Sequence, residues 1–234
     1  MDPVLEDLSE RLRAFVAFNP RVRGPHVAFL RSEAREILPG SSVLDVGAGI
    51  APFRELFAHT RYVTCDWEQS SYDEQVDIRA PATAIPVDDG SFDAIVCTEV
   101  LEHVPEPKVV LAELHRILRS GGLLLMTVPF VWFLHEEPYD YYRYTPHGLK
   151  FLLDGAGFAD LEIAPTGDAF STLAELVANL GWMMGADQDP SDQHKAAIAR
   201  AMRELGESIA SFSEYDARCI LPLGYLVKAR RPTS

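Results

Sequence analysis

Cysteine is scarce in this chain of 234 residues, which contains three. Cys65, Cys97 and Cys219 lie far apart and show neither metal-ligand spacing nor a disulfide framework, which favours a reducing compartment. Long apolar runs are lacking too, because every stretch falls well short of the roughly 20 residues that a membrane-spanning helix needs. Residues 2–7 are acidic and mixed, unlike a signal peptide. We therefore expect a soluble, cytoplasmic protein without a membrane span.

Positive charge is the second shortage. Lys and Arg number 21 against 35 Asp and Glu, which gives a formal net charge of -14. Such a surface repels phosphate backbones and anionic lipid head groups, so we expect no nucleic-acid partner. The rest of the composition, 47% hydrophobic and 24% charged, is ordinary for a globular protein, and the length suits one substantial core.

The alternation of strand-like and helix-like segments predicts the fold. Residues 1–40 show helical spacing of apolar side chains, with a break at Asn19 and Pro20. Residues 41–165 alternate short apolar runs with amphipathic segments, which indicates a doubly wound α/β fold with a mainly parallel sheet. The predicted strands are 43–46, 61–65, 94–98, 123–128, 159–163 and 220–229, and the predicted helices are 27–38, 53–58, 108–118 (closed by residues 120–122) and 146–155.

The stretch 167–216 interrupts this alternation. It contains two predicted helices, 170–184 and 190–212, and precedes the final strand at 220–229. Because the stretch is too short for a core of its own, we interpret it as a helical cap over the active site. The whole chain, 1–234, is then a single domain.

A glycine-containing loop follows the predicted strand at 43–46. Residues 47–49 let the backbone approach a bound ligand, because side chains at the two glycines would block that approach. Asp66 ends the next strand, where a carboxylate can accept protons from both ribose hydroxyls. The same arrangement could hold NAD. The dinucleotide fingerprint, however, needs a third glycine near residues 50–52, and none of these three residues is a glycine.

The segment Leu44-Asp45-Val46-Gly47-Ala48-Gly49 resembles the first motif of class I S-adenosylmethionine-dependent methyltransferases. Residues 84–93 resemble the adenine-side loop and fourth strand of that family, and residues 98–104 resemble the segment that follows. Residues 116–122 resemble the helix and turn before strand five. The resemblance implies a Rossmann-like sheet of seven strands, S-adenosylmethionine as methyl donor and S-adenosylhomocysteine as product.

The resemblance also implies roles for individual residues. The cofactor-binding candidates are Asp45, Gly47, Ala48 and Gly49 in the loop, with the glycines against the methionine part; Asp66 at the ribose; Trp67, Ala82 and Thr83 at the adenine; and Glu99 near the methionine amino group. Pro81 stands where the family often has an acidic residue for the adenine amine, and Asp77 could substitute for that residue.

Residues 135–145 read His-Glu-Glu-Pro-Tyr-Asp-Tyr-Tyr-Arg-Tyr-Thr and resemble a subfamily common in bacterial glycan and natural-product biosynthesis. Aromatic side chains here could wall the pocket beyond the carboxyl ends of the strands. His103 is a further candidate base, since an imidazole titrates near physiological pH. The catalytic candidates are His103, His135 and Tyr141, and the substrate-binding candidates are Glu136, Tyr139, Asp140, Tyr142 and Arg143.

These residues also have structural interpretations. Residues 135–145 could form an internally bonded loop that braces the helix at Pro146, and His103 could shape the turn before Pro105. Asp88, Asp89 and Asp140 are available carboxylates, but the first two suit a polar turn better, and we predict no metal. The other histidines are expected to be solvated, namely His26, His59, His115, His147 and His194.

We therefore predict an S-adenosylmethionine-dependent methyltransferase. It would transfer a methyl group by in-line displacement to oxygen or nitrogen of a small molecule, such as a glycan, natural-product or peptide intermediate. The alternatives are a cofactor-binding accessory subunit, a non-methylating enzyme on the same fold, and an NAD-dependent oxidoreductase. A homodimer is compatible with the sequence.

Overall fold

The computed structural model describes residues 8–67, 76–183, 192–216 and 218–233. The chain divides into two compact units. The first contains residues 1–129, 134–164 and 225–234, and the second contains 130–133 and 165–224. None of the helices within the described ranges is long and apolar enough to cross a membrane.

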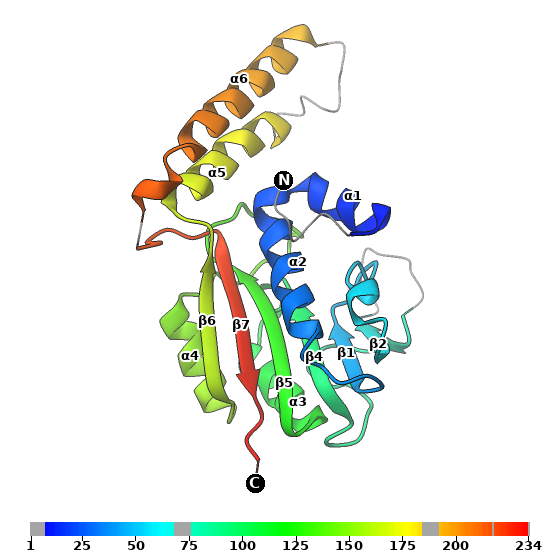
Figure 1. Cartoon of the computed structure of the whole chain (residues 1–234). Helices are drawn as coiled ribbons and strands as arrows, with labels where there is room; N and C mark the ends of the chain where they lie inside the picture. The colour runs from blue at the N-terminus through cyan, green and yellow to red at the C-terminus, as the bar shows by residue number, and fades with distance from the viewer. Residues whose placement is uncertain (1–7, 68–75, 184–191, 217, 234) are drawn as a thin grey trace. The chain divides into compact units, whose positions relative to one another are not determined.

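The described residues form one seven-stranded sheet in the order β3-β2-β1-β4-β5-β7-β6 (Figure 1). Its strands are β1 (Ser42–Val46), β2 (Arg61–Asp66), β3 (Ile78–Arg79), β4 (Phe92–Thr98), β5 (Leu118–Pro129), β6 (Ala159–Thr166) and β7 (Gly224–Arg230). β1 pairs in parallel with β2 and β4, β2 with β3, and β4 with β5. β7 runs antiparallel to β5, because Gly121 N donates to Arg231 O at one end and Phe130 N to Leu223 O at the other.

Helices cover both faces of the sheet. They are α1 (Glu10–Phe18) and α2 (Pro20–Ala34) on one face, and α3 (Pro107–Ile117) and α4 (Pro146–Gly155) on the other (Figure 1). Alternate strand residues such as Val43, Val96 and Leu125 share a buried cluster with Leu12 and Leu30 of α1 and α2. Their strand neighbours point to the opposite face, as the two-residue period of a strand requires. The predicted doubly wound sheet of seven strands is confirmed.

Local signals set several element boundaries. The Ser9 hydroxyl caps α1 by accepting from Leu12 N, and Asn19 separates α1 from α2. Thr145 accepts from Gly148 N, and Pro146 occupies the first turn of α4, where its missing N–H costs nothing. α4 therefore has the predicted bounds.

Other boundaries differ from the prediction. The glycines at 121 and 122 do not close a helix, because α3 ends at Ile117 and β5 begins at Leu118. A Cβ at position 122 would lie 2.8 Å from Arg119 O, so this glycine permits a tight irregularity at the start of β5. The helix predicted at 27–38 is α2, which begins earlier and ends at Ala34. The helix predicted at 53–58 is a 3-10 helix, η2 (Arg54–Phe57), and β3 was not predicted because two residues carry no periodic signal.

The second unit contains α5 (Ala169–Met183) and α6 (Gln193–Ala210). The bounds of these helices are close to the predicted bounds, 170–184 and 190–212. Small residues let these helices approach closely. A Cβ at Gly206 would lie 2.8 Å from Ala174 O, and one at Gly181 would lie 2.8 Å from the Cα of Ala199. A role as a cap over the active site stays a prediction.

Candidate functional site

The candidate site forms where β1, β2, β4 and β5 end. Parallel pairing brings their carboxyl ends to one edge of the sheet, the edge at which open α/β sheets bind ligands. The loops that leave Val46, Asp66, Thr98 and Pro129 therefore start from neighbouring positions. These loops contain the sequence-predicted cofactor and catalytic residues.

The glycine loop turns sharply after β1. Gly47 N and Ala48 N both donate to Cys65 O, at 2.9 and 3.1 Å, so the loop folds back over the end of β2. Gly47 and Gly49 have φ of 71° and 49°, in the left-handed region that favours glycine. A Cβ at Gly47 would lie 2.2 Å from Cγ2 of Val100, so a side chain is excluded there.

Asp66 fastens this loop to β2. Its Oδ2 accepts from Gly49 N at 2.8 Å, and its Oδ1 accepts from Trp67 N at 2.8 Å. A carboxylate has about four acceptor positions, so each oxygen can accept from a hydroxyl as well as from a backbone N–H. The structure thus brings together Asp66 and the loop glycines, as the sequence predicted.

Asp45 lies below this loop in the interior of the sheet. Its side chain is buried, and the Tyr62 hydroxyl donates to Oδ2. Burial raises the pKa of this carboxyl to about 7, although the tyrosine bond opposes the rise. In this position Asp45 supports the strand beneath the glycine loop.

The adenine-side residues follow β3. Ala80 N donates to Asp66 O at 2.9 Å, which brings the turn containing Ala82 and Thr83 toward the end of β2. Asp77 does not point along this turn. Its Oδ2 accepts from both Thr64 N and Thr64 Oγ1, each at 2.8 Å, and these bonds lower its pKa. The Asp77 side chain therefore binds Thr64 of β2.

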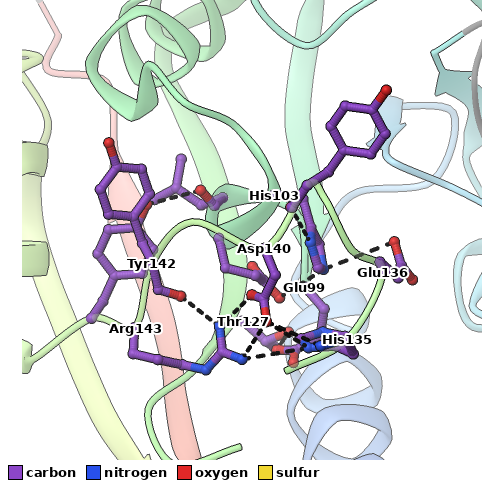
Figure 2. Close-up of polar contacts among 12 residues, drawn as sticks. Glu99, His103, Thr127, His135, Glu136, Asp140, Tyr142 and Arg143 are labelled. Carbon is purple, nitrogen blue, oxygen red and sulfur yellow. Dashed lines mark hydrogen bonds and ion pairs between the residues drawn. The ribbon is translucent and has the colours of Figure 1, made fainter. Parts of the chain in front are cut away.

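Glu99 has a backbone conformation that is unusual for a residue with a side chain. Its φ of 52° lies in the left-handed region, and such strain is found mainly at functional sites. Thr127 Oγ1 donates to Glu99 Oε1 at 2.9 Å, and His26 Nε2 lies 3.9 Å from the same oxygen (Figure 2). The expectation that His26 is solvated is wrong. It is buried within α2, and burial lowers its pKa to about 4.

Glu102, His103 and His135 form a cluster at the end of β4. Glu102 and His103 belong to the 3-10 helix η3 (Leu101–His103), and the rings of His103 and His135 meet edge to face with centroids 4.7 Å apart (Figure 2). Glu102 is 0% exposed, and neither of its carboxylate oxygens has a hydrogen-bond partner among the described residues. His103 Nε2 lies 3.6 Å from Glu102 Oε1. Burial, followed by the charge of Glu99, raises the pKa of Glu102.

Residues 135–145 are held by internal bonds, as the structural interpretation expected. Arg143 donates to both carboxylate oxygens of Asp140, at 2.6 and 2.9 Å, and this pairing lowers the pKa of Asp140 to about 2. The hydroxyls of Tyr142 and Tyr144 donate to the backbone of residues 105 and 101. Tyr141 N donates to Glu102 O, while its side chain is exposed. The segment is therefore a braced loop that borders the cluster.

Two contacts join this loop to the rest of the site. Nδ1 of His103 is 2.8 Å from the carbonyl oxygen of Tyr139, so this nitrogen carries the proton and donates. The ring of Tyr139 also packs edge to face on Trp67, with centroids 5.0 Å apart. Trp67 follows Asp66 directly, so the predicted cofactor side and the predicted acceptor side meet at Tyr139.

Sequence reasoning overlooked Glu102 and Thr127 as site residues. Thr127 carried a usable signal, because it is a polar residue near the end of an otherwise apolar strand. Glu102 carried a weaker one, because a second carboxylate three residues after Glu99 suggests a solvated turn until the structure shows that the side chain is buried.

Comparison with known proteins finds methyltransferases that are similar to part of the chain. Residues 44–126 match the family described as methyltransferase domain. A ubiquinone biosynthesis O-methyltransferase from Xanthomonas campestris pv. campestris (strain B100) is 31% identical over 125 residues, which is 47% of this chain and 50% of the relative. The chain thus aligns with about half the length of this relative. Residues 44–126 thus resemble methyltransferase domains, and this relative resembles the chain over about half of its own length.

Solved structures share the fold. The 4+2 cyclase SpnF aligns with a TM-score of 0.58 and 20% identity, covering 89% of this chain and 82% of the cyclase. A Haemonchus contortus phosphoethanolamine N-methyltransferase, solved with phosphomonomethylethanolamine and S-adenosylhomocysteine, aligns with a TM-score of 0.53 and 15% identity, covering 85% of this chain and 50% of that protein. At these identities the likeness shows a shared fold, and the Haemonchus protein is one that was solved with S-adenosylhomocysteine bound.

The Gly47 loop gives a testable prediction. Gly47→Ala should lower the free energy of unfolding by roughly 1–3 kcal/mol, because the new Cβ meets Val100 and the left-handed backbone disfavours alanine. The double variant Gly47→Ala/Val100→Ala should recover part of this loss, since only the contact is relieved. Urea unfolding measures both effects, with Val100→Ala as the matched control. A Gly47→Ala protein as stable as the wild type would contradict this account.

Asp45 should make stability fall as pH rises. In the unfolded chain its carboxyl ionises near pH 3.8, whereas in the folded protein it keeps its proton until about pH 7. Between these values the unfolded chain binds fewer protons, so raising the pH favours unfolding. Asp45→Asn lacks this effect and should gain stability relative to the wild type over the window, by about 4 kcal/mol at most.

Denaturant unfolding at about pH 4 and about pH 8 measures this difference. Asp154→Asn is the control, because Asp154 is half exposed and forms its ion pair with Lys150 on the surface of α4. Parallel pH dependence of the wild type and Asp45→Asn would refute the prediction.

Proposed function

We propose that this chain transfers the methyl group of S-adenosylmethionine to oxygen or nitrogen of a small molecule by in-line displacement. The observation that carries the proposal is the bond from Gly49 N to the Asp66 carboxylate, which places a loop without bulky side chains beside an acidic group suited to ribose hydroxyls. A cluster of titratable residues at the next strand end supplies a place for proton transfer. Both parts lie at the edge where ligands bind in this class of fold.

The residues present fit the cofactor. Val100 occupies the space that a Cβ of Gly47 would fill, which keeps the loop after β1 tightly turned, and Asp66 can accept from ribose hydroxyls. Trp67, Ala82 and Thr83 would border the adenine, and Glu99 would meet the methionine amino group. When bound, the cofactor supplies a methyl group on a positively charged sulfur, already a strong electrophile.

The chain's own task is to align the acceptor, exclude water and remove a proton. We assign the proton removal to the cluster of Glu102, His103 and His135, because a fixed Nδ1–H on His103 directs the lone pair of Nε2 away from Tyr139. Tyr141 borders this cluster with an exposed side chain and is the third catalytic candidate.

The acceptor would lie against the braced loop after β5. Glu136, Tyr139 and Tyr142 contribute a carboxylate and two partly exposed rings, while Asp140 and Arg143 hold the loop's shape. Rings of this kind suit the faces of a sugar or an aromatic acceptor. An oxygen acceptor is favoured, since the Xanthomonas relative is named as an O-methyltransferase. Residues 135–145 resemble a subfamily that is common in bacterial glycan and natural-product biosynthesis. Glycan, natural-product or peptide intermediates therefore fit this description of the acceptor.

We also propose a cytoplasmic setting and a possible pairing of two chains as properties to be tested with the function. Cys65 and Cys97 are buried free thiols, which suits a reducing compartment. A second candidate function is non-methylating chemistry with the same cofactor, since the cyclase SpnF has this fold. An accessory subunit that only binds the cofactor is the third.

Cofactor binding is the first test. Calorimetry should detect one S-adenosylhomocysteine per chain and no binding of NAD. Asp66→Ala should weaken the complex about tenfold or more, because a charge-assisted bond contributes roughly 1.5–3 kcal/mol. Asp154→Asn is the matched control and should bind like the wild type. Binding of NAD in place of S-adenosylhomocysteine would overturn the proposal.

Product formation is the second test. Incubation with S-adenosylmethionine and a panel of phenols, sugars and amines should yield S-adenosylhomocysteine and an acceptor heavier by one methyl group, both measured by mass spectrometry. Turnover of an acceptor without S-adenosylhomocysteine would favour the non-methylating alternative. Tight cofactor binding, together with retained activity in cells when His103 and His135 are both replaced, would favour the accessory subunit.

A further inference from the structure

We propose that Glu102, His103 and His135 bind a divalent transition-metal cation of the zinc type. Each residue offers one ligand atom, and the three atoms lie within 4.8 Å of one another. Two imidazoles and one carboxylate are the ligand set of many catalytic zinc and non-haem iron sites. The cluster differs from Asp88 and Asp89, the carboxylates that were set aside when the sequence led us to predict no metal.

The strongest observation is the state of Glu102. Its side chain is 0% exposed, and both carboxylate oxygens lack a hydrogen-bond partner within the described ranges of the chain. A buried carboxyl group with no partner is costly, because it has lost water and gained nothing in return. A cation bound between Glu102 and the two rings would supply the missing partner.

The imidazoles are oriented as metal ligands are. Nδ1 of His103 donates to the Tyr139 carbonyl at 2.8 Å, so Nε2 presents its lone pair toward Glu102 Oε1, 3.6 Å away. Nδ1 of His135 lies 3.5 Å from both Oδ2 of Asp140 and Nη2 of Arg143, so this nitrogen faces the Asp140–Arg143 ion pair. Histidines that bind a metal through one ring nitrogen commonly donate a hydrogen bond from the other to a backbone carbonyl or a carboxylate.

The spacing requires little movement. Ligands about 2.1 Å from a tetrahedral ion are roughly 3.4 Å apart, which follows from the usual zinc bond lengths. The facing atoms of Glu102 and His103 already lie close to this separation, and His135 stands on the loop after β5, whose exposed face allows a small approach. This geometry can close around an ion without unfolding η3.

Three protein ligands leave one coordination position open, as in catalytic zinc sites. This part of the proposal rests on the proposed function. An acceptor hydroxyl that takes the open position loses its proton to water more readily, because the cation stabilises the oxyanion. The oxygen then forms its bond to the methyl carbon as the carbon–sulfur bond breaks, and the sulfur keeps the electron pair.

Cobalt binding tests the site directly. The full chain is freed of metal with a chelator and titrated with Co²⁺, with no methyl donor present, and visible absorption reports ligation. One Co²⁺ per chain is expected, displaced by Zn²⁺. Glu102→Gln, His103→Asn and His135→Asn should each weaken Co²⁺ binding at least tenfold, while His147→Asn should not, since His147 lies in the first turn of α4, away from the cluster.

Circular dichroism confirms that each variant is folded, and His135→Asn is the decisive variant because it lies in a loop with a partly exposed side chain. A cobalt affinity that is the same in His135→Asn and the wild type, or the absence of ligand-field absorption, overturns the proposed site. S-adenosylhomocysteine calorimetry on the same metal-free sample tests the proposed function separately. Methyl transfer at full rate without metal overturns the catalytic role of the cation.

Discussion

The parallel pairing of β1 with β2 and β4 is the constraint on which the site depends. It brings three strand ends to one edge, and each end contributes a different part of the site. These parts are the glycine loop after Val46, the carboxylate of Asp66, and the acidic turn after Thr98. The bond from Gly49 N to Asp66 then fixes the loop across the first two strands. A slip in register would reverse the faces of the strands and separate these groups.

Two kinds of buried carboxyl group surround this edge. Asp45 and Glu99 each have one oxygen that accepts from a hydroxyl, that of Tyr62 or of Thr127, while Oδ1 of Asp45 has no partner among the described residues. Glu102 has no such partner among the residues that the structure places. Of these three carboxyl groups, Glu102 is the one with neither oxygen hydrogen-bonded, and the proposed cation site rests on this difference.

Much of the fold could be predicted from the sequence, because its signals are local. Apolar runs located the central strands, and Thr145 with Pro146 located α4. The two-residue strand β3 and the direct passage from α3 into β5 could not be predicted, since the first is too short for a period and the second depends on tertiary pairing. At the site, the glycines and Asp66 were predicted from their chain positions. The burial of Glu102 was not, because it depends on the loop of residues 135–145 packing over η3.

The arrangement of Glu102 and His103 limits how the cluster can act. With Nδ1 protonated by its bond to Tyr139, Nε2 presents a lone pair to a carboxylate oxygen 3.6 Å away. Two acceptors facing each other in a buried site repel, unless a positive partner lies between them. A divalent cation satisfies both groups and still leaves a coordination position for the acceptor oxygen.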